Sequence, residues 1–419
     1  MTLSMQPYKG ARDFYPEDMK IQSWMFEKMH HVISSFGYEQ YNAPMLEPVD
    51  LYAAKTGQEI VEKQLYAFTD RGGRNVALRP EMTPSLARMV AARFQQLPKP
   101  IRWYSIPNLW RYEKPQRGRL REHWQLNCDL LGGERVLADT EILMLACAIV
   151  DAYGGSEFVK IRINHRGLMD HVFAHHGLLG ENALAMTKLL DARSKIGEEV
   201  FVREATLIAD KKLLAFFDLP FERIAIEYPC LGTQELTHVM QVLGDRVQFD
   251  SSIMRGMDYY TGLVFEMYDQ SPENPRAMFG GGRFDNLIGL FGKNDLSGVG
   301  FGFGDVTLRH FLETHNLLPQ FGPKLDVFIS LPDAGLFAQI AAIAAQLRPE
   351  LRVVTALESG GFREQLKMAD KLEARFVVLF GAEEESRGAV LVKDLIQGVQ
   401  HEVQVSALQS FILERKGTV

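Results

Sequence analysis

Residues 110–125 read WRYEKPQRGRLREHWQ and lie between two segments that read as extended. Residues 102–111 and 122–131 have the composition of strands, and the loop at 117–119 would join them into one long hairpin. Residues 111–121 of the hairpin carry five Lys and Arg side chains beside Glu113. Guanidinium groups suit phosphate oxygens because their fork matches phosphate geometry and they keep their charge. The alternative is a basic turn that only faces water.

Length and charge set the context of this hairpin. With 419 residues the chain is too long for one typical domain, so two or three are expected. The formal net charge of −7 argues against a protein that binds duplex DNA mainly through phosphates, although it leaves room for one local basic face. We therefore expect no DNA partner.

Cysteine content and hydropathy favour a cytoplasmic protein. The three cysteines form no C-x-x-C pair, which fits a reducing compartment and argues against a zinc ribbon. The N-terminus has no apolar signal core, and the most apolar stretches are too short or too interrupted to span a bilayer. We expect no membrane partner.

The first 322 residues predict one α+β domain. Apolar residues at helical spacing predict a helix over 21–36, and Pro84 would open another over 83–96. Residues 166–240 are mostly helical in pattern and are interpreted as an insertion. Other expected features are strands at 75–78, 159–164 and 258–267, a glycine turn at 279–283, and a glycine-rich strand at 297–304 that leads into a helix.

A second domain is expected from residue 323, after the Phe-Gly-Pro sequence at 321–323. Strand and helix patterns alternate beyond it, which predicts a small α/β domain with a partly parallel sheet. Arg363, Lys367 and Lys371 share one face of an expected helix over 363–371. They either meet phosphates or form an ordinary solvated face.

The hairpin resembles motif 2 of class II aminoacyl-tRNA synthetases, through Arg-x-Glu, a loop, Gly-Arg-x-Arg and an aromatic-Gln strand. It is most similar to the histidyl-tRNA synthetase family. Residues 255–266, RGMDYYTGLVFE, resemble the signature of that family. Residues 78–85, LRPEMTPS, and 280–285, GGGRFD, also resemble family segments, and residues 361–379 resemble the family's anticodon-binding domain. Without this context, the tyrosines would read as core residues and Thr83-Pro84 as a helix start.

The resemblance implies a fold, a reaction and site residues. The catalytic domain would be a class II synthetase-like antiparallel sheet with flanking helices, followed by an α/β anticodon-binding-like domain. The chain would use ATP and Mg²⁺ to activate histidine and would join it to tRNA(His). Arg111 and Arg255 would be catalytic, and ATP would be bound by Arg111, Glu113, Arg119 and His123. Histidine would be bound by Glu81, Thr83, Gln125, Asp129, Arg255, Tyr259 and Tyr260.

The sequence departs from the family at three places. Val306-Thr307 stands where motif 3 usually has Glu-Arg, and that arginine normally lies on the adenine near the γ-phosphate. Arg309 is about 200° around the helix from Thr307, so it cannot simply replace that arginine. His123 stands where the other adenine face usually meets a larger aromatic ring, and Asp129 stands where a glutamate is common.

The leading hypothesis is therefore a histidine–tRNA ligase that acts as a homodimer, because Pro44 matches motif 1, which lies at the dimer interface in this class. The altered motif 3 keeps a second hypothesis open, a non-catalytic regulatory subunit of ATP phosphoribosyltransferase. The anticodon-like domain argues against that hypothesis. A ligase for another acceptor is a third. The sequence leaves the residues that would bind a metal ion unassigned.

Overall fold

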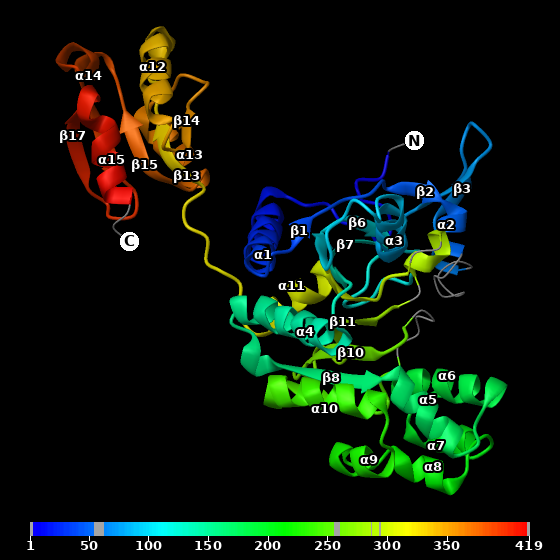
Figure 1. Ribbon diagram of the computed structural model, residues 1–419. Coiled ribbons are helices and arrows are strands. Elements are labelled where there is room, and N and C mark those ends of the chain that lie inside the picture. The colour runs from blue at the N-terminus through cyan, green and yellow to red at the C-terminus, as the bar shows by residue number, and fades with distance from the viewer. Residues whose placement is uncertain (1–2, 54–62, 255–259, 286, 293–294, 417–419) are drawn as a thin grey trace. The chain divides into compact units, whose positions relative to one another are not determined.

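The computed structural model describes residues 3–53, 63–254, 260–285, 287–292 and 295–416 (Figure 1). The chain divides into two compact units, Met1–Leu318 and Pro319–Val419. Each unit has its own sheet and its own core of buried apolar side chains.

The N-terminal unit is built on a sheet that has nine strands among the described residues. The strand order is β1-β5-β7-β12-β11-β10-β8-β9, and β6 pairs with β7. Pairs from β5 to β8 are antiparallel, whereas the edge pairs β1–β5 and β8–β9 are parallel. The strands are β1 (Glu39–Gln40), β5 (Ile101–Ser105), β6 (Asn108–Trp110), β7 (Glu122–Leu131), β8 (Val159–His165), β9 (Val247–Phe249), β10 (Leu263–Asp269), β11 (Ala277–Arg283) and β12 (Gly298–Gly304).

Helices cover one face of this sheet. Phe265, Phe301 and Phe303 alternate with residues of the other face and belong to the same main core as Phe311 of α11. Figure 1 shows α10 running beside β8, and the two are in contact. The helices of this layer are α1 (Pro16–Ser35), α4 (Arg135–Ala152), α10 (Leu231–Leu243) and α11 (Asp305–Thr314). The predicted antiparallel sheet with flanking helices is confirmed.

Smaller elements complete this unit. A three-stranded sheet, β2 (Leu46–Pro48), β4 (Asn75–Leu78) and β3 (Ala67–Thr69), lies with α2 (Val49–Ala53) near α3 (Thr83–Ala92). Between β8 and α10 the helices are α5 (Arg166–His175), α6 (Gly180–Ile196), α7 (Glu198–Ala205), α8 (Lys211–Phe216) and α9 (Phe221–Glu227). Single 3₁₀ turns lie at Ser156–Phe158, Gly244–Arg246 and Ile288–Phe291.

Three local predictions were wrong. The strand expected over 102–111 is broken at Pro107, because proline has no N–H to give to a ladder. The helix expected over 83–96 ends at Ala92. The glycine turn expected at 279–283 is part of strand β11. Its glycines allow close strand packing, since a Cβ on Gly281 would lie 2.0 Å from the carbonyl oxygen of Gly300.

The C-terminal unit is an α/β domain, as predicted. Its sheet order is β14-β13-β15-β16-β17, with β14, β13 and β15 parallel and the rest antiparallel. The strands are β13 (Leu325–Ile329), β14 (Val353–Thr355), β15 (Ala374–Leu379), β16 (Ala389–Asp394) and β17 (Gln400–Gln404). The helices are α12 (Phe337–Leu347), α13 (Phe362–Lys371), α14 (Ala382–Arg387) and α15 (Leu408–Lys416), with 3₁₀ turns at Ala334–Leu336 and Val405–Ala407.

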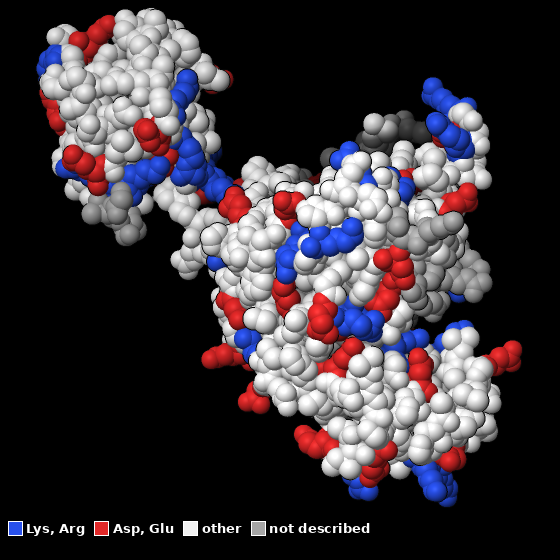
Figure 2. Space-filling view, in the orientation of Figure 1, with Lys and Arg blue, Asp and Glu red and all other residues white. Residues whose placement is uncertain are grey.

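The surface agrees with the mixed charge of the chain. Basic and acidic side chains are interspersed over the face that Figure 2 shows. Within the described ranges, none of the helices combines the length and the apolar character that crossing a membrane requires.

Gly281→Ala is expected to destabilise the N-terminal unit by more than about 2 kcal/mol, because the methyl group would overlap the backbone of β12. Urea unfolding followed by tryptophan fluorescence measures this, since all four tryptophans lie before residue 125. Gly289→Ala is the control, because the nearest atom to its added Cβ is 3.8 Å away. Equal midpoints for the two variants would contradict the close packing.

Candidate active site

The candidate site lies on the sheet face opposite the main helical layer, and its centre is strand β7. His123, Gln125 and Asp129 are two or four residues apart, so their side chains emerge on the same face. Glycines of β12 lie beneath them. A Cβ on Gly302 would lie 2.4 Å from Nε2 of Gln125, and one on Gly300 would lie 2.3 Å from Oδ1 of Asp129. The polar side chains therefore rest on bare backbone.

The loop of the hairpin brings Arg111, Glu113 and Arg119 together. Nε of Arg111 donates to the carbonyl oxygen of Pro80 at 2.8 Å, which fixes the guanidinium beside the 79–83 segment. Oε2 of Glu113 accepts from Nη1 of Arg119 at 3.3 Å. The Glu113 side chain is 13% exposed and that of Arg119 is 55% exposed, so Arg119 remains open to a ligand.

A buried arginine holds the 79–83 segment in place. Arg79 donates to the carbonyl oxygens of Asn108 at 2.9 Å and Ala43 at 2.6 Å. This anchors the buried carboxyl group of Glu81 near the first strands of the hairpin. Thr83 follows as the first residue of α3 and is half-buried. A carboxylate and a hydroxyl at this place can accept hydrogen bonds from an ammonium group.

Asp129 is a strongly perturbed carboxyl group of the site. Burial, and then the charge of Glu81, raise the pKa of Asp129 to about 8. Its Oδ2 atom is buried and has no hydrogen-bond partner within the described ranges. Asp129 lies opposite Trp103 in the register of β5 and β7, and Trp103 stacks on Tyr41 with ring centroids 5.6 Å apart. An unpaired buried carboxyl group in an aromatic surrounding is suited to a polar ligand.

His123 is neutral at physiological pH. Burial, and then the charges of Arg111 and Arg12, lower the pKa of His123 to about 3. A neutral imidazole can stack on a base without adding another positive charge to this basic region.

The start of α11 has no cation in the place where motif 3 has its arginine. Thr307 donates its hydroxyl to the carbonyl oxygen of Met278 at 2.7 Å. Arg309 forms ion pairs with Asp18 and Glu313, both at 2.9 Å. These pairs hold Arg309 at the N-terminal end of α1, so it does not take over the role of the missing arginine.

The structure describes only part of the 255–266 signature. Arg255 and Tyr259 lie outside the described residues. Tyr260 is 8% exposed, and a Cβ on Gly282 would lie 2.7 Å from its ring. Tyr260 therefore packs closely on the backbone of β11.

A buried charge network holds the end of this signature. The amide of Thr261 donates to the carbonyl oxygen of Arg283 at 2.8 Å, and its hydroxyl donates to Asp285 at 2.8 Å. The guanidinium of Arg283 donates to Asp139 of α4 at 2.8 Å, and both side chains are 1% exposed. Arg135, which binds Asp285, also binds Glu235 of the helical segment at 3.2 Å. The end of the 255–266 signature and the helical segment are thus joined through one network of hydrogen bonds and ion pairs.

Several residues of the site were missed by sequence reasoning. No local sequence pattern marks Tyr41 and Trp103 as site residues. Tyr41 directly follows β1, and its ring stacks on Trp103 only because β1 pairs with β5. Arg12 belongs to an irregular N-terminal segment, and only its contact with Asp305 places it near α11. Arg79 stood within a recognised segment, yet its anchoring role depends on Asn108 and Ala43.

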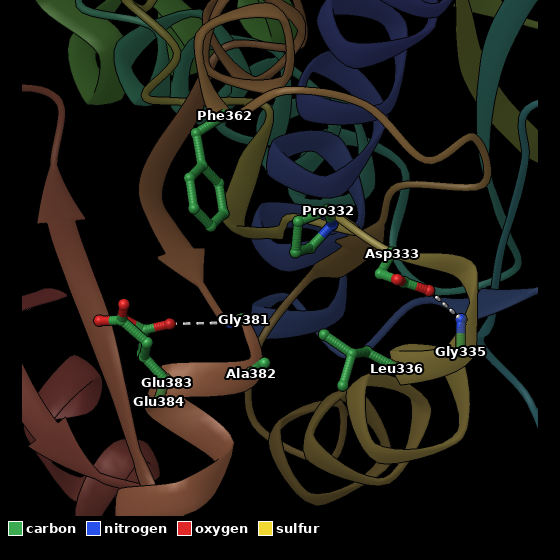
Figure 3. Close-up of a pocket in the computed structure, with 9 residues that line it drawn as sticks. All are labelled: Pro332, Asp333, Gly335, Leu336, Phe362, Gly381, Ala382, Glu383 and Glu384. Atoms are coloured by element: carbon green, nitrogen blue, oxygen red, sulfur yellow. Dashed lines mark hydrogen bonds between the residues drawn. The ribbon is translucent and has the colours of Figure 1, made fainter.

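A pocket of about 580 Å³ lies in the C-terminal unit (Figure 3). The rings of Phe362 and Pro332 and the side chain of Leu336 form part of its wall. Two backbone N–H groups at its edge are already used, that of Gly335 by Asp333 at 2.7 Å and that of Gly381 by Glu384 at 3.0 Å. This pocket contains none of the predicted site residues.

Comparisons with known proteins cover both units. The histidyl-tRNA synthetase family model matches residues 10–305, and the anticodon binding domain model matches residues 326–415. A histidine--tRNA ligase from Leptospira biflexa is 45% identical over 94% of both chains. One from Thermoplasma volcanium is 35% identical and covers 98% of this chain and 99% of its own. A crystal structure of histidyl-tRNA synthetase from Nostoc has a TM-score of 0.82 at 24% identity, covering 99% of this chain and 100% of that one.

Asp129→Asn is expected to stabilise the N-terminal unit increasingly as the pH rises. Because the pKa of Asp129 is raised to about 8, the folded chain keeps a proton that the unfolded chain loses near pH 4. The wild-type free energy of unfolding therefore falls, relative to the variant, by up to about 1.4 kcal/mol per pH unit between pH 5 and 8.

The measurement is urea unfolding by tryptophan fluorescence from pH 5 to 9. Asp170→Asn, on the exposed side of α5, is the control and should show no such trend. A difference between wild type and Asp129→Asn that does not change with pH would show that Asp129 is ionised in the free protein.

Proposed function

The chain belongs to the histidyl-tRNA synthetase family, and from this we propose that it activates L-histidine with ATP to histidyl-adenylate and transfers the histidyl group to the 3′ end of tRNA(His). The observation that carries the proposal is that Gln125 and Asp129 lie on one glycine-floored face, with the charge of Glu81 close to Asp129 and Arg111 bound to the carbonyl oxygen of Pro80. Relatives that match over almost the whole chain, anticodon-binding domain included, are named histidine--tRNA ligases. This supports the ligase over a regulatory subunit.

The histidine side of the site would recognise both ends of the amino acid. Glu81 would pair with the ammonium group, with Thr83 as a second acceptor. Gln125 and Asp129 would face the imidazole, and the raised pKa of Asp129 lets its carboxyl group donate or accept a proton in that contact. Tyr259 and Tyr260 would form one side of the site that binds the imidazole.

The ATP side would be formed by the hairpin. Glu113 would accept from the amino group of adenine, His123 would stack on the ring, and the exposed Arg119 would reach the phosphates. Mg²⁺ would enter with ATP.

Adenylate formation would depend on positioning and charge. The histidine carboxylate attacks the α-phosphorus, and the bond between that phosphorus and the pyrophosphate oxygen breaks. Arg111 and Arg255 would offset the negative charge that develops at the α-phosphate. Mg²⁺ would neutralise the leaving pyrophosphate.

Transfer would follow on the same face. A hydroxyl of the 3′-terminal ribose would attack the carbonyl carbon of the adenylate. Its proton would pass to a phosphate oxygen of AMP, which leaves with the electron pair of the broken bond. No protein residue is required as the general base. The C-terminal unit would hold the tRNA, since Arg363, Lys367 and Lys371 are all exposed along α13.

We further propose a homodimer that acts in the cytoplasm. Met45, Leu46 and Phe68, at or beside the small sheet that follows Pro44, are 42–50% exposed, which fits a partner surface. The three cysteines are unpaired, in keeping with a reducing compartment.

Histidine-dependent ATP–pyrophosphate exchange tests the activation step. The purified chain should exchange with histidine and not with other amino acids. Arg111→Ala should lower the exchange rate at least about a hundredfold, because a fixed cation at the α-phosphate is lost. Lys114→Ala, an exposed cation of the same hairpin, should stay within about twofold of wild type. Histidine binding without any exchange would favour a regulatory role.

The triple variant Arg363→Ala, Lys367→Ala, Lys371→Ala should raise the KM for tRNA(His) about tenfold or more, because up to three phosphate contacts are removed. Pyrophosphate exchange needs no tRNA and is the internal control, so its rate should not change. An unchanged KM for tRNA would show that this face of α13 is only solvated.

A further inference from the structure

A buried carboxylate lies at the altered start of α11. Asp305, the first residue of that helix, has a side chain only 3% exposed. Its Oδ1 accepts from the backbone amide of Trp124 at 3.0 Å, and its Oδ2 accepts from Nη2 of Arg12 at 2.7 Å. Arg12 is therefore held between the first turn of α11 and the part of β7 that carries His123.

The N-terminal segment that brings Arg12 to this place is fastened to the hairpin. The carbonyl oxygen of Gly10 accepts from the amides of Arg121 at 2.9 Å and Glu122 at 3.1 Å. Gly10 has φ +89°, and a Cβ there would lie 2.7 Å from the side chain of Arg121, so only glycine fits this contact. Phe14 packs edge-on against Trp124 with ring centroids 5.2 Å apart. Both flanks of Arg12 are thus fixed on β7.

The guanidinium of Arg12 keeps binding capacity after it pairs with Asp305. A guanidinium has five N–H donors, and Asp305 accepts from one terminal nitrogen. The Nε atom is buried without a partner among the residues the structure describes, and the side chain is 24% exposed. The charge of Arg12 also reaches His123, whose pKa it helps to lower.

We propose that Arg12 supplies the cation for ATP that the Val306-Thr307 sequence lacks, approaching the nucleotide from the N-terminal segment beside His123. This inference rests on the proposed function only in taking ATP as the ligand. Asp305 orients the guanidinium through the hydrogen bond to its Oδ2 atom. The methyl group of Thr307 lies near Gly118 of the hairpin loop, so the changed position of motif 3 faces the same loop as the ATP-binding arginines. In this proposal the cation comes from the N-terminal segment, which packs against the first turn of α11, and not from the helix itself.

A plainer role for Arg12 is to neutralise the buried charge of Asp305. The two roles differ in which second substitution should restore the ATP affinity that Arg12→Gln loses. If Arg12 binds ATP, a new arginine at position 307 should restore what Arg12→Gln loses. If Arg12 only neutralises Asp305, removing that carboxylate should restore it.

The experiment is calorimetric titration of the full chain with ATP·Mg²⁺ and, separately, with histidine. Arg12→Gln should weaken ATP binding about tenfold or more and leave histidine binding within twofold. Arg12→Gln with Thr307→Arg should recover most of the ATP affinity, whereas Arg12→Gln with Asp305→Asn should not. Arg309→Gln is the matched control, because that cation of α11 is held by Asp18 and Glu313, and its ATP affinity should stay within twofold.

Unchanged ATP affinity in Arg12→Gln, or rescue by Asp305→Asn and not by Thr307→Arg, would overturn the inference. If Arg12→Gln lost affinity for both ATP and histidine and also had a lowered unfolding midpoint, the inference would be overturned as well. That result would indicate that Arg12 acts in folding alone. The proposed function is judged separately by pyrophosphate exchange of the wild type. If the wild type catalyses exchange but Arg12→Gln binds ATP normally, the proposed function holds and the inference fails. If ATP binding depends on Arg12 but the wild type catalyses no exchange, the inference holds and the proposed function fails.

Discussion

The close antiparallel approach of β12 to its neighbours is the constraint on which the site depends. Gly300 and Gly302 lie beneath Asp129 and Gln125 so closely that a methyl group on either would overlap a side-chain atom. On the other side, Gly281 meets the backbone of β12. The floor of the site is therefore backbone, and the polar side chains of β7 lie on it with little room to change conformation. Pre-organisation of this kind keeps recognition groups in place before a ligand arrives.

Buried charge is distributed unevenly around this floor. Arg283 and Asp139 form an ion pair and are almost fully buried. Arg79 donates hydrogen bonds to the backbone oxygens of Asn108 and Ala43. These charged groups are therefore stabilised by contacts within the protein. Asp129 has no such partner within the described residues, and burial keeps it protonated near neutral pH. The structural arginines hold the scaffold, while the unsatisfied carboxyl group is left for the ligand.

At the proposed ATP end, residues from distant parts of the chain meet at the start of α11. The helix that begins at Asp305 lacks the usual arginine, but its first turn binds Arg12, which is more than 290 residues away in the chain. The same aspartate holds the amide of Trp124, next to His123. The N-terminal segment, β7 and the start of α11 thus meet at the carboxylate of Asp305. A charge lost from one of these segments could therefore be replaced from another while the sheet keeps its place.

The sequence by itself determined the sheet-and-helix architecture, the second α/β domain and the family, because the 110–125 hairpin, the 255–266 signature and the 78–85 segment are local patterns. It also predicted that His123, Gln125 and Asp129 belong to one strand, and alternate residues of a strand share a face. It misread the 279–283 glycines as a turn, because glycine signals both turns and close packing, and only the neighbouring strands distinguish them. Tertiary structure alone decided that Tyr41 stacks on Trp103 and that Arg12 reaches Asp305. Such contacts join residues far apart in the chain, so no local period or spacing encodes them.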